Sequence, residues 1–253
     1  MSINPKNAGV IVIGNEILSG RTQDLNVAYI GKKLEELGIV LSEVIIIPDL
    51  EVEIIDKVRM YSKKYDYVFT TGGIGPTHDD ITTASIAKAF DVNVVRSKDA
   101  VDRMQKFYKH DQLTEARLKM ADIPEGAILI NNFVSGAPAF KVENVFVLAG
   151  VPEIMRSMFD SLVEHLVSGP PILTASVCTN LTESKLAVGM SDIQKKTQEV
   201  SIGSYPFFKH GHLGVNIVLR STKKDLLFKQ HKLVEELVKS LEGKILEIQT
   251  PTK

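Results

Sequence analysis

The feature that most constrains the fold is the repeated alternation of short apolar runs with helical patterns over the first two thirds of the chain. Apolar or β-branched runs at 8–13, 44–47 and 67–71 each stop at glycine or proline, as buried strands do. Helical spacing follows each of them, for example at 82–90. Such alternation predicts an α/β domain whose mostly parallel sheet has helices on both faces, a three-layer α/β/α arrangement. The same segment predicts a later strand at 127–130, a hairpin of 140–142 with 145–147, and a helix over 152–167.

The last third of the chain has a different rhythm. Its patterns predict, in order, a strand at 173–179, a helix carrying Leu186, Met190 and Ile193, strands near 200–205 and 213–219, a helix over 226–241 and a strand at 245–248. The order β-α-β-β-α-β is that of a small split βαβ domain of the α+β class.

A cluster of helix and strand breakers at 168–171 (Ser-Gly-Pro-Pro) separates the two segments. We therefore expect one domain at 1–169 and a second at 170–253. Residues 1–170 carry 18 basic and 23 acidic side chains, a net charge of −5, whereas residues 171–253 carry 12 and 8, a net charge of +4. Differences of this size between two halves are common, so they support the boundary only weakly.

Composition excludes several classes of protein. With 44% hydrophobic and 24% charged residues, the chain is not a disordered one. Cys178 is the single cysteine, so an intramolecular disulfide is impossible. We expect no secretory signal, because residues 1–9 do not combine a basic start with an apolar stretch, and no membrane helix, because no apolar run reaches the ~18 residues that one needs. A net charge of −1 gives no electrostatic footprint for nucleic acid. We expect a cytoplasmic protein whose partners include neither membrane nor nucleic acid.

The stretch 70–82 (Thr-Thr-Gly-Gly-Ile-Gly-Pro-Thr-His-Asp-Asp-Ile-Thr) leaves a predicted strand and enters a predicted helix. Ligands of open parallel sheets bind at the carboxyl ends of the strands. Glycine backbone there can approach a ligand closely, and successive N–H groups can bind an anion. The alternative is a glycine-rich turn followed by an Asp or Thr helix cap, and spacing alone leaves the two interpretations about even.

Asp79 and Asp80 favour a ligand. A carboxylate beside a phosphate is unfavourable unless a cation lies between them, so the pair suggests a hard divalent metal that bridges to the ligand. Adjacent residues point in different directions. One aspartate can cap the helix while the other faces the ligand, and the sequence does not say which.

Other loops follow strands at the same sheet edge, and their shared edge predicts one site. Each also has a structural alternative, because Asp24 can cap a helix and Glu16 can be a solvated loop acid. The candidate residues outside the glycine-rich stretch are Glu16, Asp24, Ser135, Gly136, Pro138, Gly150 and Pro152.

Histidines give weaker signals. His78 lies beside the aspartates, but a single loop histidine is more often a surface residue. A metal site at His210-x-His212 is not expected, because no acidic partner is near in sequence. The G-x-x-G at 211–214 falls between predicted strands, which favours a hairpin turn over an RNA-clamping loop.

The sequence resembles the CinA-type molybdopterin-binding domain, a family that includes the N-terminal part of competence/damage-inducible protein A and the first domain of eukaryotic FAD synthases. The main motif is 71–77 with Asp79, Asp80 and Thr82, which fits T-G-G-[LI]-G-P-T-x-D-D-x-T. Three further segments also resemble the family: 14–20 with Asp24 and Asn26, Gly136-Ala137-Pro138 with Phe140, and 150–155. Residues 183–186 and 201–206 resemble the family's small KH-like domain.

The resemblance implies a first domain similar in fold to molybdopterin adenylyltransferases (MoaB/MogA-like). In those enzymes an Arg-Asp pair follows the glycine loop, whereas this chain has Asp79-Asp80, with Asp80 aligned to the catalytic aspartate. The missing arginine weakens the case for adenylylation. The family's metal-dependent hydrolysis of nucleotide diphosphates implies Mg, Mn or Co, with potassium as a further candidate. It also implies a homo-oligomer, a dimer or trimer, and the family's C-terminal deamidase domain is expected to be absent.

The resemblance implies site residues as well. Asp79 and Asp80 are expected to be catalytic and to bind the metal, with Glu16 and Asp24 as further metal ligands. Ligand binding is assigned to Thr71, Gly72, Gly73, Gly75, Thr77, Ser135, Gly136, Pro138, Gly150 and Pro152.

Three functions compete. The first is a metal-dependent pyrophosphatase acting on ADP-ribose or a similar dinucleotide. The second is molybdopterin binding or adenylyl transfer in molybdenum cofactor biosynthesis. The third is a non-catalytic nucleotide-binding protein.

Overall fold

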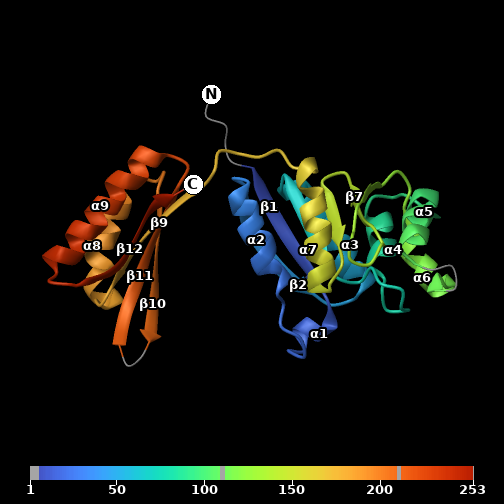
Figure 1. Ribbon diagram of the computed structural model, residues 1–253, viewed down its shortest axis with the longest axis horizontal. Helices are drawn as coiled ribbons and strands as arrows, with labels where there is room; N and C mark the ends of the chain where they lie inside the picture. Colours follow the sequence, from blue (N-terminus) through green and yellow to red (C-terminus); the bar gives the residue numbers. More distant parts are fainter. Residues whose placement is uncertain (1–5, 109–111, 210–211, 253) are drawn as a thin grey trace. The chain divides into compact units, whose positions relative to one another are not determined.

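The strand β1 (Asn7–Ile13) is buried along six of its seven residues, as its apolar run predicts. In the computed structural model, which describes residues 6–108, 112–209 and 212–252, β1 lies inside a six-stranded sheet (Figure 1). The strand order is β2-β1-β3-β8-β7-β6, with β2 at Val40–Ile47, β3 at Tyr67–Thr71, β8 at Val145–Leu148, β7 at Ala139–Val142 and β6 at Ile128–Ile130. Pairing is parallel from β2 to β8, and β7 runs antiparallel to β8 and β6. The mostly parallel sheet is therefore confirmed.

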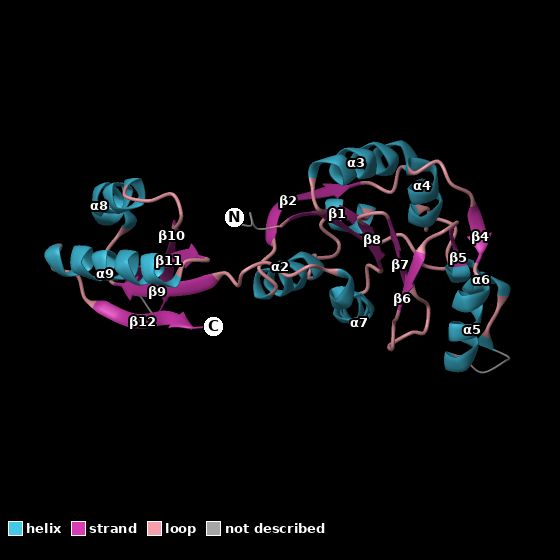
Figure 2. Cartoon of the chain, turned by 90° about the horizontal axis from the view of Figure 1, so that it is seen from above, coloured by secondary structure: helices cyan, strands magenta, loops and turns pink. Residues whose placement is uncertain are grey.

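Helices cover both faces of this sheet (Figure 2). One face packs against α2 (Asn26–Glu36) and α7 (Pro152–Leu162), which contribute Ile30, Leu34 and Phe159 to the core. The other face packs against α3 (Glu51–Lys64) and α4 (Thr82–Ala89). The three-layer α/β/α arrangement is confirmed. The helix predicted over 152–167 ends at Leu162, followed by the short helix η3 (Val163–His165).

Between α4 and β6 the chain makes an excursion that the sequence patterns did not predict. Its described residues form a two-stranded antiparallel sheet and three short helices, with a small core of their own. The elements are β4 (Val94–Arg96), α5 (Lys98–Phe107), α6 (Glu115–Leu118), η2 (Lys119–Ala121) and β5 (Asp122–Pro124). Only Ala100 and Met104 of α5 are buried. So narrow an apolar face gives a weak periodic signal. The helix α1 (Asn15–Leu18) was also missed, because it is a single turn.

The chain forms two compact units, Met1–Gly169 and Pro170–Lys253. The second contains β9 (Leu173–Thr179), α8 (Glu183–Lys195), β10 (Ser201–Lys209), β11 (His212–Ser221), α9 (Lys224–Ser240) and β12 (Ile245–Thr252). These confirm the predicted β-α-β-β-α-β order, and their antiparallel sheet is ordered β10-β11-β9-β12. One face of the sheet packs against α8 and α9 through residues such as Val177, Ile217 and Val234. The predictions at His210 and Gly211 lie outside the described residues.

Among the helices that the structure describes, none has both the length and the apolar character needed to cross a bilayer.

At the carboxyl edge of the first sheet, β3 leads into a glycine that no other residue can replace without strain. Gly72 has a φ of 103°, and a Cβ added to it would lie 2.1 Å from the carbonyl oxygen of Ile13. Its neighbour across the edge is Gly150, where an added Cβ would lie 3.3 Å from the Gly72 Cα. The ends of β1, β3 and β8 therefore come together through glycine backbone.

We predict that Gly72→Ala lowers the free energy of unfolding by about 2–4 kcal/mol, because it adds both an unfavourable φ and a clash with backbone. Gly20→Ala is the matched control. Gly20 also has a positive φ, 70°, but an added Cβ there meets nothing within 4 Å. That change should cost only about 1–2 kcal/mol. Urea unfolding of both variants measures the difference, and equal losses would contradict the close approach at Gly72.

Candidate functional site

The loops that follow β1 and β3 are tied to neighbouring strands by backbone hydrogen bonds. Gly14 N–H donates to Ile47 O at 3.1 Å, and Gly72 N–H donates to Leu148 O at 3.1 Å. The Gly72 N–H is thus used within the sheet, which removes it from the expected phosphate cradle. For Gly73 and Gly75, the described residues supply no acceptor to the backbone N–H. Of the three glycine N–H groups expected to bind an anion, those of Gly73 and Gly75 therefore remain available.

The carboxylate of Asp80 folds back onto its own loop. It accepts hydrogen bonds at Oδ2 from the Thr77 N–H at 2.8 Å and from Thr77 Oγ1 at 2.6 Å. The same oxygen lies 2.6 Å from where a Cβ of Gly75 would be, so a larger residue at position 75 would displace the Asp80 carboxylate. Helix α4 follows Ile81 as its N-cap and has no side-chain cap. The expectation that one aspartate caps this helix is therefore wrong for both Asp79 and Asp80.

Asp79 is exposed and shares the Thr77 hydroxyl with Asp80. Thr77 Oγ1 lies 2.5 Å from Asp79 Oδ1 and 2.6 Å from Asp80 Oδ2. The hydrogen bond from Thr77 holds the pKa of Asp79 below its usual value, with smaller contributions that include the nearby charges of His78 and Lys119. One hydroxyl proton cannot satisfy two carboxylates at once. The loop therefore concentrates negative charge where a cation would be stabilised.

Lys119, which was not predicted from the sequence, binds the Thr77–Asp80 loop from a neighbouring segment of the chain. It lies on η2, and its Nζ donates hydrogen bonds to the carbonyl oxygens of Thr77 and, at 3.2 Å, Asp80. Because Lys119 is about forty residues from the motif and on a short unpredicted helix, no sequence pattern links the two.

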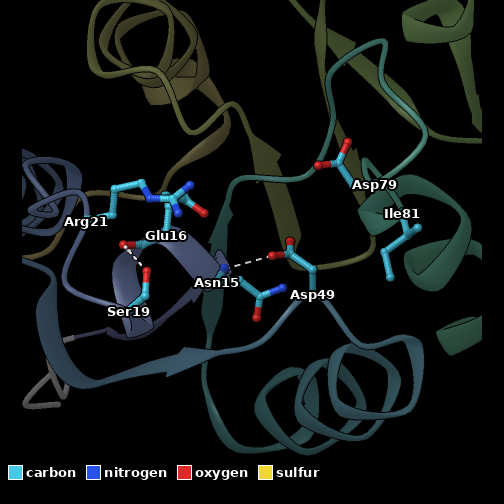
Figure 3. A pocket seen from close by; sticks show the side chains of 7 residues that line it. All are labelled: Asn15, Glu16, Ser19, Arg21, Asp49, Asp79 and Ile81. Carbon is cyan, nitrogen blue, oxygen red and sulfur yellow. Dashed lines mark hydrogen bonds between the residues drawn. The ribbon is translucent and has the colours of Figure 1, made fainter.

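A cavity of about 530 Å³ opens beside the loop (Figure 3). Its lining residues are Asn15, Glu16, Ser19, Arg21, Asp49, Asp79 and Ile81. Asp49 follows β2 and accepts a hydrogen bond at Oδ2 from the Asn15 N–H at 2.8 Å. Asp49 was not predicted as a site residue. It does, however, follow a strand at the carboxyl edge of the sheet, and that position is what identified the predicted site residues. In Figure 3 Glu16 and Arg21 lie on one side of Asp49 and Asp79 lies on the other.

A second, smaller chamber of about 50 Å³ adjoins Glu16 and is also lined by Asp24, Thr71, Gly150 and Pro152. Asp24 Oδ1 accepts a hydrogen bond from the Val27 N–H at 2.9 Å in the first turn of α2. The helix-capping interpretation of Asp24 is therefore the one that the structure supports.

Ser135, Gly136 and Pro138 lie between β6 and β7 at the same edge, but they are not among the described lining residues of either cavity. Asn132 fixes this loop: its Nδ2 donates to Ser135 Oγ at 2.7 Å and to Ala137 O at 2.9 Å. Gly136 packs so closely on Phe107 that an added Cβ would lie 2.5 Å from that side chain. These contacts give the loop a structural role.

No three His, Cys, Asp or Glu side chains of the described residues are grouped closely enough to hold a metal ion. Magnesium, however, is commonly held by one or two carboxylates together with substrate phosphates and water. The carboxylates of Asp79 and Asp80, which both contact the Thr77 hydroxyl, fit a magnesium ion bound in that way.

We predict that Thr77→Val raises the pKa of Asp79 toward its usual value, because the hydroxyl that stabilises the carboxylate is lost. A lowered pKa stabilises the folded loop above the ordinary carboxyl pKa, and this contribution disappears as the pH falls through the lowered value. Carboxyl NMR titration measures the shift. Asp66, whose pKa is lowered by a hydrogen bond from Lys6, is the internal control and should not move. An unchanged Asp79 would contradict the assigned cause.

Two known families match the chain. The family described as "Probable molybdopterin binding domain" matches residues 9–169, and the family described as "FAD synthase, middle domain" matches residues 171–248.

Individual relatives agree with these matches. A protein of Archaeoglobus fulgidus is 38% identical over 90% of this chain and 96% of its own length. The CinA-like protein of Kosmotoga olearia and the "Probable FAD synthase" of Caenorhabditis elegans are each 32% identical, over 87% and 88% of this chain. The chain spans only 55% and 48% of those two proteins.

A crystal structure of CinA from Thermoplasma acidophilum, a protein of unknown function, aligns with 63% of this chain and 98% of its own, at 36% identity and a TM-score of 0.58. The chain therefore belongs to the CinA-like family of molybdopterin-binding domains.

Proposed function

We propose that this chain is a metal-dependent pyrophosphatase that hydrolyses ADP-ribose or a similar dinucleotide. The observation that carries the proposal is the convergence of Asp79 and Asp80 on the hydroxyl of Thr77, beside the N–H groups of Gly73 and Gly75. Carboxylates repel a diphosphate, so this arrangement favours a phosphate ligand only when a cation lies between them.

The metal would be Mg²⁺, Mn²⁺ or Co²⁺, held by Asp79 and Asp80 together with substrate phosphate and water, while Glu16 lies on the other side of the larger cavity (Figure 3). Asp24 is less suited to the role, since it caps α2. When bound, such an ion polarises a phosphoryl group and lowers the pKa of water. Potassium remains a further ion to be tested.

The chain's own groups would bind and orient the diphosphate. The N–H groups of Gly73 and Gly75 donate hydrogen bonds to phosphate oxygens, and the Arg21 guanidinium supplies positive charge at the far side of the cavity. Lys119 acts as a positioning residue, because it holds the carbonyl groups of Thr77 and Asp80 and so fixes the loop.

The relatives support a nucleotide over other anions. One of them is named "Probable FAD synthase", and the second unit of this chain matches the middle domain of FAD synthase. FAD, like ADP-ribose, contains an AMP unit joined through a diphosphate.

We expect the protein to release AMP from ADP-ribose when Mg²⁺, Mn²⁺ or Co²⁺ is present, measured by chromatography of the products. Asp79→Asn and Asp80→Asn should each lower the rate at least ~100-fold, because each removes a charge that places the metal. Asp56→Asn, on the exposed side of α3, is the matched control and should keep the full rate. Equal background rates in the wild type and both site variants would refute the proposal.

Molybdopterin binding is the second candidate, favoured by the family match over residues 9–169. It predicts micromolar binding of molybdopterin by the intact chain, measured by calorimetry, without need of Asp79. Tight nucleotide binding with no turnover under any of the three metals would instead indicate a non-catalytic nucleotide-binding protein.

A further inference from the structure

The small chamber beside the proposed diphosphate site contains polar groups that the chain leaves unsatisfied. It lies at the ends of β1 and β3, under the start of α2 and the loop after β8. Asn26 and Thr71 both line it, and they are only 4% and 1% exposed. Within the described part of the chain, neither Asn26 Oδ1 nor Thr71 Oγ1 has a hydrogen-bond partner.

The orientation of Asn26 is fixed by its other amide atom. Asn26 Nδ2 donates to Gly150 O at 2.8 Å, so the unpartnered atom is the carbonyl oxygen, which can only accept. A buried acceptor without a donor is unfavourable, and native proteins seldom keep one without a reason. Both unsatisfied atoms belong to residues that line one chamber, which points to a ligand that donates hydrogen bonds.

The lining residues also restrict the chemistry of this ligand. The described lining residues include the acids Glu16 and Asp24 and no Lys, Arg or His, so the chamber does not suit phosphate. Much of the remaining wall is apolar, with Val12, Ile17 and Leu25 among its residues. At about 50 Å³ the chamber is far too small for a nucleobase, although it exceeds the room that one water molecule needs.

We propose that this chamber binds the cis-diol of a nucleotide ribose. One hydroxyl donates to Asn26 Oδ1 and the other exchanges a hydrogen bond with Thr71 Oγ1, with the Asp24 carboxylate as a further acceptor. Glu16 lines both this chamber and the larger cavity, so a nucleotide with its diphosphate at Gly73 and Gly75 can place its sugar here. This inference rests on the proposed nucleotide substrate and names the part of it that the chain recognises.

A neutral diol suits the chamber better than a metal ion. A hard cation such as magnesium keeps several water ligands, and a chamber of about 50 Å³ with a partly apolar wall has little room for them. Hydroxyl groups satisfy the two buried atoms without bringing a full charge out of water.

Thr71→Val and Thr70→Val form a matched pair of tests. Thr70 is also fully buried with an unpartnered hydroxyl, but it is not among the lining residues of the chamber. Removing an unsatisfied buried hydroxyl in favour of a methyl group should leave the melting temperature unchanged or raised in both variants. The pair therefore separates loss of a ligand contact from loss of folding.

The probes are AMP and 2′,3′-dideoxy-AMP, bound to the whole chain with Mg²⁺ and measured by calorimetry. We expect the wild type to bind AMP at least ~10-fold more tightly than the dideoxy compound. Thr71→Val should weaken AMP binding ~3–10-fold and leave dideoxy-AMP binding unchanged, and Thr70→Val should change neither.

An AMP preference that is the same in Thr71→Val and wild type would overturn the inference and leave ordered water as the occupant. A changed metal requirement with an unchanged preference would also overturn it, in favour of a cation. Either result, together with AMP release from ADP-ribose, would leave the proposed activity intact. If no nucleotide is bound or hydrolysed, both the activity and the diol site are wrong.

Discussion

The close approach of glycine backbone at the carboxyl edge of the first sheet is the constraint on which the site depends. Gly72 leaves no room for a side chain between β3 and the Ile13 carbonyl oxygen, and Gly150 lies directly against it. Because the three strand ends meet so closely, the loops that follow them share one edge. The larger cavity, the small chamber and the Thr77–Asp80 loop all lie where these loops meet.

The chemistry of that edge follows from an imbalance of charge and hydrogen bonding. Asp79 and Asp80 approach one hydroxyl, while Asn26 Oδ1 and Thr71 Oγ1 lack donors in the described chain. The fold keeps both arrangements although each is unfavourable alone. A nucleotide with its metal would relieve both, since the cation neutralises the aspartates and sugar hydroxyls satisfy the buried acceptors. Features that lower stability in the free protein are common where a ligand binds.

Periodicity predicted the parts of the fold that are buried on a regular face. The strand predicted at 67–71 matches β3 (Tyr67–Thr71) closely, because a buried apolar run that stops at glycine is a local signal. Helix α5 was missed because it buries only two residues. The glycine-rich motif and its place at the carboxyl edge of the sheet predicted Asp79 as a site residue, and Asp79 lines the larger cavity. Lys119, in contrast, contacts the loop through tertiary structure, which no local sequence pattern encodes.

The most direct test is the metal dependence of diphosphate binding. Calorimetry with a methylene-bridged, non-hydrolysable analogue of ADP-ribose separates binding from turnover. If a cation bridges the aspartates to the diphosphate, affinity should rise steeply with Mg²⁺ and nearly vanish in EDTA, because the carboxylates then repel the ligand. Equal affinity with and without the metal would show that the glycine loop binds the ligand unaided and that the acidic pair has another purpose.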